Sequence, residues 1–374
     1  MTARNVAMIL NSLGSGGVPE AVLNLCAHLP RDRYAPQVFV LKEVPEQSDL
    51  SERFASLDVP VTIARQSDGK IGTVAELADW LGHAGIDVLH SHSYRPNLYG
   101  RMAGAICRPS GLRIVAHYHN QYDDKWPEGS PAILLERRLA QVTDRFIAVS
   151  EAVRDHVAKA IALPSAGVSV IANGITADKV RKVDRRTARR FLGLDGDGLA
   201  VGLIGRVCAQ KGQEDLVEAA LCLRHRLPDA VFLMIGAVED RALHSRLEAR
   251  IAAAGAGDRI RFCGHLADIA PAYAGLDLLV APSRWEGFGL MLVEAMAAGL
   301  PIIATDAGAI AEVTGSAARL VPVGDHEALA SAIAGFDRDA RAAAVRTGLV
   351  RARSFDWSVA ASRLALLYDG LPWP

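Results

Sequence analysis

Residues 277–313 read DLLVAPSRWEGFGLMLVEAMAAGLPIIATDAGAIAEV, and their pattern decides the fold. A short apolar run ends at Ala281, a turn-rich loop continues to Gly289, and an apolar window with helical spacing starts at Leu290. A buried strand followed by a loop and a helix is the unit from which parallel sheets are built. Gly287 and Gly289 let the backbone approach a ligand closely, and free N–H groups at the start of a helix favour phosphate. This segment therefore predicts a strand–loop–helix unit that binds phosphate.

The same alternation of short apolar runs and amphipathic windows extends through the whole chain. It predicts an α/β protein with two parallel sheets covered by helices. Ligands of such sheets bind outside the carboxyl ends of the strands. The expected strands are residues 6–10, 38–41, 88–90, 114–117, 146–149, 168–171, 200–204, 231–235, 260–262, 278–281, 302–304 and 320–323. The expected helices include residues 20–29, 73–81, 214–224, 292–298 and one that starts at 151 with Ser150 as its N-cap.

Length and composition narrow the class of protein. The chain has 374 residues, half of them apolar, which suits two domains with separate cores. Its 41 basic and 42 acidic side chains almost cancel, so nothing global favours nucleic acid as a partner. No apolar run reaches the roughly 18 residues of a membrane span. The five cysteines form no Cys-x-x-Cys pair, and we expect them to be reduced core residues of a cytoplasmic protein.

Two carboxylates bracket the turn of the first segment. Glu286 lies on the loop and Glu294 lies in the apolar helix that follows. Carboxylates accept hydrogen bonds from hydroxyls, which sugar and ribose supply in adjacent pairs. The plain alternative is two solvated glutamates, but a carboxylate inside an apolar helix requires a partner or a cleft.

A cationic pair follows the first strand of the second series. Residues 202–220 read GLIGRVCAQKGQEDLVEAA, in which Arg206 and Lys211 flank a loop that leads to a helix. Such a pair can neutralise a diphosphate and stabilise a nucleotide leaving group. Two solvated loop cations are the alternative interpretation.

Taken together, these residues resemble the retaining glycosyltransferases of family four, whose GT-B fold has two Rossmann-like domains facing across a deep cleft. The resemblance covers nearly the whole chain. Its most specific part is the pair Glu286 and Glu294 with seven residues between them. The other matching segments are Gly16-Gly17, His117 at a strand end, RFIAVS at 145–150, VIANGI at 170–175, Gly205-Arg206 and Lys211-Gly212.

The resemblance also implies a domain organisation. A last amphipathic helix, expected at residues 358–368, would return to the first domain. We therefore expect an N-terminal acceptor-side domain of residues 1–178 plus 356–374 and a C-terminal donor-binding domain of residues 179–355. The crossing near residue 356 is a candidate hinge for closure over the donor.

Residue roles are carried over from the family to the matching positions. Arg206 and Lys211 would bind the donor diphosphate, while Glu286 would contact sugar hydroxyls. Glu294 would hold the ribose. The resemblance implies four catalytic residues, Arg206, Lys211, Glu286 and His117. It implies six donor-binding residues, Gly16, Gly17, Phe288, Gly289, Leu290 and Glu294. The family often has an acidic residue soon after the paired glycines, whereas Val18 and Pro19 stand here, which affects the expected shape of this loop.

The expected activity is transfer of a sugar from a nucleotide-sugar to a hydroxyl acceptor, with retention of anomeric configuration. By resemblance, the leaving diphosphate takes the acceptor proton, without a metal or a protein nucleophile. The nucleotide-sugar is a substrate, so we expect no cofactor. A UDP-sugar is the favoured donor, with GDP-mannose as the alternative. The acceptor would belong to polysaccharide, glycolipid or small-glycoside biosynthesis, and a lipid-linked acceptor is among the options.

Histidines cluster in two strand ends, HSHSY (His90, His92) and HYHN (His117, His119). Strand alternation places the members of each pair on one side. A metal site is the weaker interpretation, because no carboxylate or cysteine completes a familiar ligand spacing. We expect a polar wall toward the acceptor instead, formed by His92, Tyr94, Arg95 and Asn120.

Two further segments have plain explanations. Residues 179–190 contain seven basic side chains, which we expect on a solvated helix; contact with anionic lipid at the inner face of the membrane is the alternative. Asp195-Gly196-Asp197 resembles a metal-binding Asp-x-Asp, but its position in a Gly-rich linker favours a turn.

Two other functions compete with sugar transfer. Two βαβ domains would also serve an NAD-dependent oxidoreductase, although residues 14–17 lack the third glycine of the G-x-G-x-x-G fingerprint. A non-catalytic sugar-nucleotide-binding partner of another transferase is the third option, which slow hydrolysis of the donor without acceptor would argue against.

Overall fold

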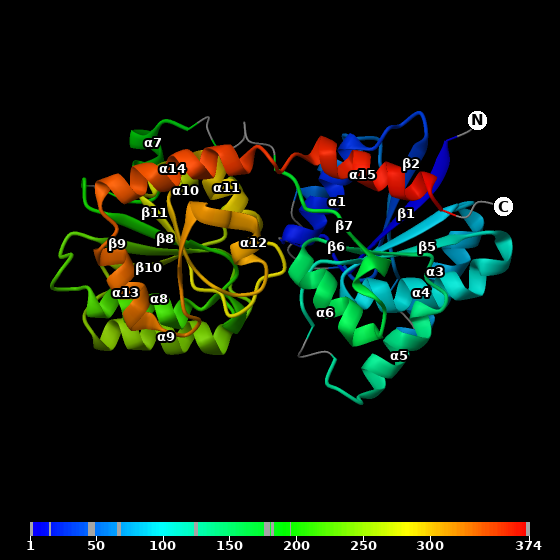
Figure 1. Ribbon diagram of the computed structural model, residues 1–374, viewed down its shortest axis with the longest axis horizontal. Coiled ribbons are helices and arrows are strands. Elements are labelled where there is room, and N and C mark those ends of the chain that lie inside the picture. Colours follow the sequence, from blue (N-terminus) through cyan, green and yellow to red (C-terminus); the bar gives the residue numbers. More distant parts are fainter. Residues whose placement is uncertain are drawn as a thin grey trace. The chain divides into compact units, whose positions relative to one another are not determined.

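The computed structural model describes residues 3–14, 16–43, 49–65, 69–122, 126–175, 180, 183–194 and 196–371. The chain divides into two compact units, Met1–Gly174 with Asp356–Pro374 (unit 1) and Ile175–Phe355 (unit 2). Each unit contains one parallel sheet with helices on both faces (Figure 1). This is the Rossmann-like arrangement expected from the alternating pattern.

The sheet of unit 1 has seven strands in the order β3-β2-β1-β4-β5-β6-β7. The order reverses between β1 and β4, which pair directly, with Val6 opposite Val88. Ligands of such sheets bind beyond the carboxyl ends of the strands near this point. The strands are β1 (Arg4–Leu10), β2 (Tyr34–Val40), β3 (Val61–Ile63), β4 (Val88–His92), β5 (Arg113–Tyr118), β6 (Arg145–Ala148) and β7 (Val168–Val170).

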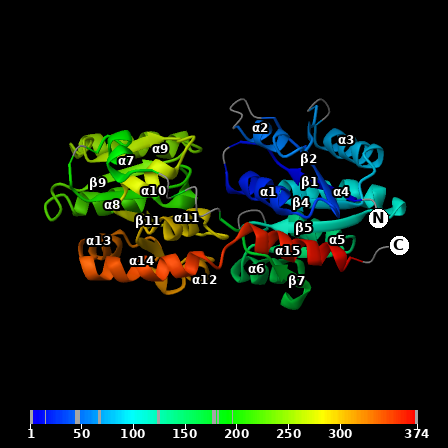
Figure 2. The ribbon, with the colours of Figure 1, turned by 90° about the horizontal axis from the view of Figure 1, so that it is seen from above.

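The helices of unit 1 cover both faces of this sheet. Helices α3 (Gly69–His83) and α4 (Tyr94–Cys107) lie side by side and bury the core around Leu77, Leu89 and Ile114 (Figures 1 and 2). The Ser150 hydroxyl accepts from the Val153 N–H at 3.1 Å, which confirms the predicted N-cap of α6. The helices are α1 (Gly17–His28), α2 (Leu50–Ala55), α3 (Gly69–His83), α4 (Tyr94–Cys107), α5 (Pro131–Ala140), α6 (Glu151–Ile161) and α15 (Trp357–Asp369).

The last helix, α15, belongs to unit 1 and packs on α1. The Tyr34 hydroxyl donates to Asp369 at 2.6 Å, and Arg33 pairs with the same carboxylate at 2.8 Å. Tyr34 and Tyr368 also contact each other, with ring centroids 5.2 Å apart. Helix α15 is therefore fixed to α1 and to the start of β2.

The sheet of unit 2 has six strands in the order β10-β9-β8-β11-β12-β13. They are β8 (Ala200–Ile204), β9 (Val231–Ile235), β10 (Ile260–Gly264), β11 (Leu278–Ala281), β12 (Ile302–Thr305) and β13 (Ala318–Val321). The helices are α7 (Arg185–Phe191), α8 (Gln213–Cys222), α9 (Arg241–Ala253), α10 (Ala270–Gly275), α11 (Leu290–Ala298), α12 (Ile310–Thr314), α13 (His326–Ala334) and α14 (Arg338–Ala352).

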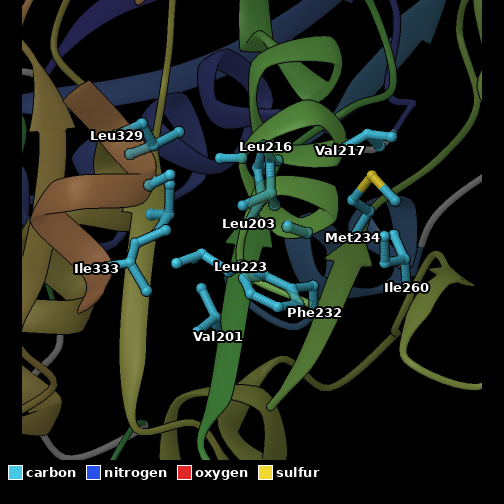
Figure 3. Close-up of a cluster of buried hydrophobic side chains, with 14 of the residues drawn as sticks. Val201, Leu203, Leu216, Val217, Leu223, Phe232, Met234, Ile260, Leu329 and Ile333 are labelled. Atoms are coloured by element: carbon cyan, nitrogen blue, oxygen red, sulfur yellow. The ribbon is translucent and has the colours of Figure 1, made fainter. Parts of the chain in front are cut away.

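The core of unit 2 lies between its sheet and helices α8, α9 and α13. Phe232 and Leu203 from the strands meet Leu216 from α8 and Ile333 from α13 (Figure 3). Burial of such apolar surface is the dominant stabilising contribution in a domain of this size. It fixes β8, whose carboxyl end carries the cationic loop.

Three expectations require correction. The short strand β3 was not predicted, because its three residues are only partly buried and give a weak apolar signal. The last strand ends at Val321, two residues earlier than expected, since Pro322 cannot donate to a sheet ladder. The cysteines are free, but Cys222 is exposed near the end of α8 and is not a core residue.

Among the described residues, no helix is both long and apolar enough to span a bilayer.

Candidate active site

The two loops singled out by sequence lie at the carboxyl ends of two neighbouring central strands of the unit 2 sheet. Strands β8 and β11 are parallel neighbours, with Val201 opposite Leu278. Their carboxyl ends therefore place residues 205–212 beside residues 282–289. The Arg284 N–H donates to the Gln210 carbonyl at 2.8 Å, and the Gln210 amide donates to the Trp285 carbonyl at 3.1 Å. The loops form one connected surface.

Lys211 and Glu286 form a direct ion pair within this surface. The Lys211 Nζ lies 2.5 Å from Glu286 Oε2, and the two side chains are only 12% and 10% exposed. Charge-assisted hydrogen bonds of this kind are stronger than neutral ones. The family resemblance implies that Lys211 binds the donor diphosphate and Glu286 the sugar hydroxyls, and their mutual contact was not predicted. The pair holds a cation at the start of α11.

Two glycines shape the backbone around Glu286. Gly289, with φ of 81°, is the N-cap residue of α11. Gly308 has φ of 56°, and a Cβ at this position would lie 2.3 Å from the Glu286 carbonyl oxygen. The next N–H, of Ala309, donates to that same oxygen at 2.9 Å. The loop after β12 therefore contacts the Glu286 backbone at a distance that only glycine permits.

Arg206 lies on the same loop as Lys211 but is more accessible. Its side chain is 43% exposed and pairs with Glu239, which is also exposed. Exposed ion pairs contribute little to stability, so Arg206 can exchange Glu239 for another anion at low cost. The Arg206 carbonyl accepts from the Gln213 amide at 2.7 Å, which fixes the backbone of the loop.

Glu294 lies on α11, half-buried, and accepts a hydrogen bond from the Tyr273 hydroxyl of α10. Burial raises the pKa of Tyr273 well above its usual value, so the hydroxyl stays protonated and donates. The partner that a carboxylate in an apolar helix requires is therefore this tyrosine. Sequence reasoning missed Tyr273, because no local pattern links positions 21 residues apart.

Phe288 and Leu290 flank Gly289 at the start of the helix. The Phe288 ring is buried and meets Phe355 edge-on, with centroids 5.5 Å apart. Its side chain is a core group, so a contact of Phe288 with a ligand would come from its backbone. Leu290 is partly buried at the first position of α11.

The candidate residues of unit 1 follow the carboxyl ends of its central strands. Gly16 and Gly17 are exposed where the chain after β1 enters α1. His92 ends β4 directly opposite His117 in β5. These strands are parallel, so the glycine turn and the histidines lie at the same edge of the sheet.

The four histidines gather in one cluster, in which His90, His92 and His117 are buried and His119 is half-buried. His90 and His92 have ring centroids 4.2 Å apart, and His117 and His119 have the same separation. Burial lowers the pKa of His90, His92 and His117 well below its usual value and that of His119 to about 3. All four rings are therefore neutral near pH 7.

The other residues expected on the acceptor side lie around this cluster in different environments. Tyr94 starts α4 and contacts Tyr122 and Trp126, with ring centroids 6.0 Å and 6.4 Å away. Arg95 is exposed, while Asn120 is half-buried and its side-chain oxygen accepts from the Gln121 N–H. His92 itself is fully buried. Their role toward an acceptor stays a prediction.

Comparison with known proteins identifies the family. Residues 15–179 match the family described as Glycosyltransferase Family 4, and residues 198–339 match Glycosyl transferases group 1. The phosphatidyl-myo-inositol mannosyltransferase of Mycobacterium leprae is 30% identical over 372 residues, covering 95% of this chain and 93% of that relative. The chain belongs to glycosyltransferase family 4. It is an enzyme of the hexosyltransferase type.

Another relative of this family 4 glycosyltransferase is the lipopolysaccharide core biosynthesis mannosyltransferase LpsB of Rhizobium meliloti. It is 39% identical over 213 residues, which are 54% of this chain. The match spans 61% of the length of that relative. The family matches do not favour the NAD-dependent oxidoreductase considered above.

Solved structures support the GT-B fold of this glycosyltransferase. HepE of Anabaena, solved in complex with UDP-glucose, aligns with a TM-score of 0.86 over 98% of this chain and 100% of the other, at 22% identity. WaaG, a glycosyltransferase involved in lipopolysaccharide biosynthesis, aligns with a TM-score of 0.76 over 98% and 100%, at 15% identity.

The basic segment of this glycosyltransferase is only partly described, since residues 176–179, 181 and 182 lie outside the described ranges, as does Asp195. In the described part, Arg185 and Arg189 of α7 both pair with Asp277, at 2.6 Å and 3.2 Å. These two arginines therefore tie α7 to the start of β11.

Proposed function

We propose that this enzyme transfers a mannosyl residue from a nucleotide-activated donor to a hydroxyl group of a glycolipid acceptor of the lipopolysaccharide-core type. The support is the names of its relatives, which include a lipopolysaccharide core mannosyltransferase and a phosphatidyl-myo-inositol mannosyltransferase. A lipid-linked acceptor would bring the enzyme into peripheral contact with a membrane surface.

The observation that carries the proposal is the Lys211–Glu286 pair at the start of α11. A diphosphate brought to this point meets the Lys211 ammonium and the N–H groups of the first helical turn. Arg206 adds a second cation by leaving its exposed partner Glu239. Preorganised positive charge stabilises the negative charge that develops on a departing nucleotide.

Binding of the donor would also change the role of Glu286. When the diphosphate takes part of the Lys211 charge, the Glu286 oxygens become available to hydroxyls of the transferred sugar. During this exchange the Glu286 backbone stays fixed by its contact with Gly308 and by the hydrogen bond from the Ala309 N–H. Glu294, oriented by Tyr273, would accept from the ribose hydroxyls.

We propose retention without a protein nucleophile. The bond between the anomeric carbon and the diphosphate oxygen breaks, and the acceptor oxygen bonds to that carbon on the same face. The acceptor proton passes to the departing diphosphate. Glu286 is bound by Lys211 and serves as a hydrogen-bond acceptor rather than as an attacking group. The two cations supply the charge neutralisation that a metal ion would otherwise provide.

A mannosyl donor favours GDP-mannose, whereas sequence analysis favoured a UDP-sugar. Both are nucleoside diphosphate sugars and would use the same cations. The two donors differ in the base, and no contact of the described loops distinguishes guanine from uracil. The UDP-sugar stays a prediction and becomes one arm of the test.

The test is a transfer assay with purified enzyme, a glycolipid acceptor that exposes lipopolysaccharide-core hydroxyls, and a panel of GDP- and UDP-sugars. We expect one mannose to be added from GDP-mannose, with the α-configuration kept as judged by NMR, and with full activity in EDTA. Transfer only from a UDP-sugar would show that the donor is a UDP-sugar and not GDP-mannose. Absence of both transfer and slow donor hydrolysis would overturn the activity.

A further inference from the structure

The histidine cluster of unit 1 has a geometry that the transfer chemistry does not require. His90, His92 and His117 are each at most 1% exposed. Two come from β4 and one from β5, and the register of the strands puts His92 opposite His117. One ring nitrogen from each residue lies within 4.8 Å of those of the other two.

Among the described residues, most ring nitrogens of His90, His92 and His117 have no hydrogen-bond partner. Nε2 of His90, Nε2 of His92 and both nitrogens of His117 are buried without a hydrogen bond among the described residues. Buried polar atoms are nearly always paired, because an unpaired one loses its hydration without compensation. Here the unpaired atoms belong to three neighbouring side chains, and one ring nitrogen of each lies within 4.8 Å of those of the other two.

We propose that this cluster binds one divalent transition-metal ion of the Zn²⁺ type through Nε2 of His90, Nε2 of His92 and a ring nitrogen of His117. Imidazole nitrogen is a preferred ligand of such ions, and three histidines leave a fourth position for a small ligand. To bind one ion at Zn–N distances of about 2.0–2.1 Å the rings must move closer together. The rings of His90 and His117, now nearly parallel with an interplanar angle of 7°, must also turn toward a common point.

The atoms on the far side of the rings suit this role. His90 Nδ1 lies 2.6 Å from the Tyr368 hydroxyl oxygen, and His92 Nδ1 lies 3.1 Å from His119 Nε2. With the metal on Nε2, each Nδ1 carries its proton and donates to these partners. Such outer contacts orient metal-binding histidines and increase their basicity. Tyr368 comes from α15, so the helix at the end of the chain would support the site.

The ion takes no part in the transfer reaction proposed above, which relies on cations of unit 2. The inference therefore stands or fails separately from the proposed function. His117, however, was also expected to approach the transferred sugar. A bound ion would occupy one of its nitrogens.

The experiment measures metal binding directly on the full chain. Protein treated with a chelator is equilibrated with Co²⁺ and then with Zn²⁺, long enough for ions to reach the buried rings. Binding is followed by visible Co²⁺ absorption and by equilibrium dialysis. We expect a single Co²⁺ per chain with the absorption typical of tetrahedral nitrogen ligation, displaced by Zn²⁺.

Variants assign the ligands. His92→Asn and His117→Asn should weaken Co²⁺ binding by at least about tenfold, as should Tyr368→Phe, which removes only the outer hydroxyl. His28→Asn, which changes an exposed histidine of the same unit, should bind as the wild type does. Circular dichroism and cooperative melting establish that each variant is folded.

Tyr368→Phe keeps the inference testable if His92→Asn fails to fold. Equal Co²⁺ binding by wild type, His117→Asn and Tyr368→Phe would overturn the proposal, as would wild-type protein that retains no ion after equilibration.

Discussion

Lys211 illustrates how one side chain serves both the resting protein and the proposed reaction. Its ammonium group is almost buried, and a buried charge without a partner would be costly. Glu286 provides that partner, so the site keeps a cation ready without a ligand. A diphosphate would then share or replace this partner while the charge stays in place.

Removal of that cation gives the first prediction. Lys211→Ala should lower kcat by roughly a hundredfold or more, the scale of losing one charge-stabilising group. The substitution also leaves Glu286 buried without its partner, so the unfolding temperature of Lys211→Ala should be lower than that of the wild type. Arg206→Ala should lower kcat on a similar scale, with less effect on stability because its own pair is exposed. The measurement is the steady-state rate of sugar transfer.

Arg250→Ala is the matched control for these two variants. Arg250 belongs to an exposed pair with Glu218 on the same unit, remote from the two loops in sequence. It should keep wild-type kcat. Wild-type rates in Lys211→Ala and Arg206→Ala would remove both residues from the mechanism.

The contact between Tyr273 and Glu294 gives a second prediction. Tyr273→Phe keeps the buried ring and removes only the hydroxyl that orients Glu294. We expect KM for the nucleotide-sugar to rise several-fold with little change in kcat, because Glu294 is proposed to hold the ribose and not the reacting atoms. Donor binding can be checked by calorimetry. A selective fall in kcat would place Glu294 nearer the reacting carbon.

At this scale the sequence singled out charged residues but not their contacts. Arg206, Lys211 and Glu286 were selected because they lie on glycine-containing loops that follow buried strands, and Glu294 because a carboxylate in an apolar helix requires a partner. Their part in the reaction stays a prediction. Their partners could not be selected. Glu286 and Lys211 are 75 positions apart, and only the pairing of β8 with β11 brings them together.

Among the elements, the three loops that follow β8, β11 and β12 act as one support for Glu286. The first supplies Lys211, the second carries Glu286, and the third reaches its backbone through Gly308 and Ala309. Each loop follows a buried strand, so the core under the sheet fixes where the site lies (Figure 3).

The close contact between the loop after β12 and the Glu286 backbone gives a third prediction. Gly308→Ala puts a Cβ where the Glu286 carbonyl oxygen lies only 2.3 Å away, in addition to the cost of φ of 56°. The loop must move, and Glu286 must move with it. We expect a strong loss of activity and a fall in the unfolding temperature.

Gly255→Ala separates the two effects. Gly255 has φ of 60° but nothing within 4 Å of an added Cβ. It should lose only the roughly 1–2 kcal/mol of a left-handed alanine and keep its activity. Equal behaviour of the two variants would show that contact with Glu286 is unimportant.

The elements themselves were largely predictable, for a physical reason. Strands buried on both faces read as apolar runs, and β8, β9 and β11 were located to the residue. Prediction was weaker where burial is partial. Strand β3 lies at the edge of its sheet, so its residues carry a weak signal.

For the whole molecule, the decisive feature is that the chain returns to unit 1 at its end. Unit 1 consists of two separate stretches, and α15 is joined to the first of them only through contacts. Sequence pattern showed an amphipathic helix at this place but not its partner. The resemblance to GT-B enzymes supplied that expectation, since the face of a helix does not identify what covers it.

The packing of α15 on the rest of unit 1 gives the last prediction. Leu364 is fully buried on α15, whereas Leu366 on the same helix is 70% exposed. Leu364→Ala should destabilise unit 1 by roughly 2–5 kcal/mol, the range for a buried leucine, while Leu366→Ala should change little. Hydrogen exchange resolves the two units, and we expect Leu364→Ala to increase exchange in α1 and β2 and not in β8 or β11. Faster exchange throughout both units would mean that they unfold as one cooperative body, because the loss of a contact confined to unit 1 would then destabilise unit 2 as well.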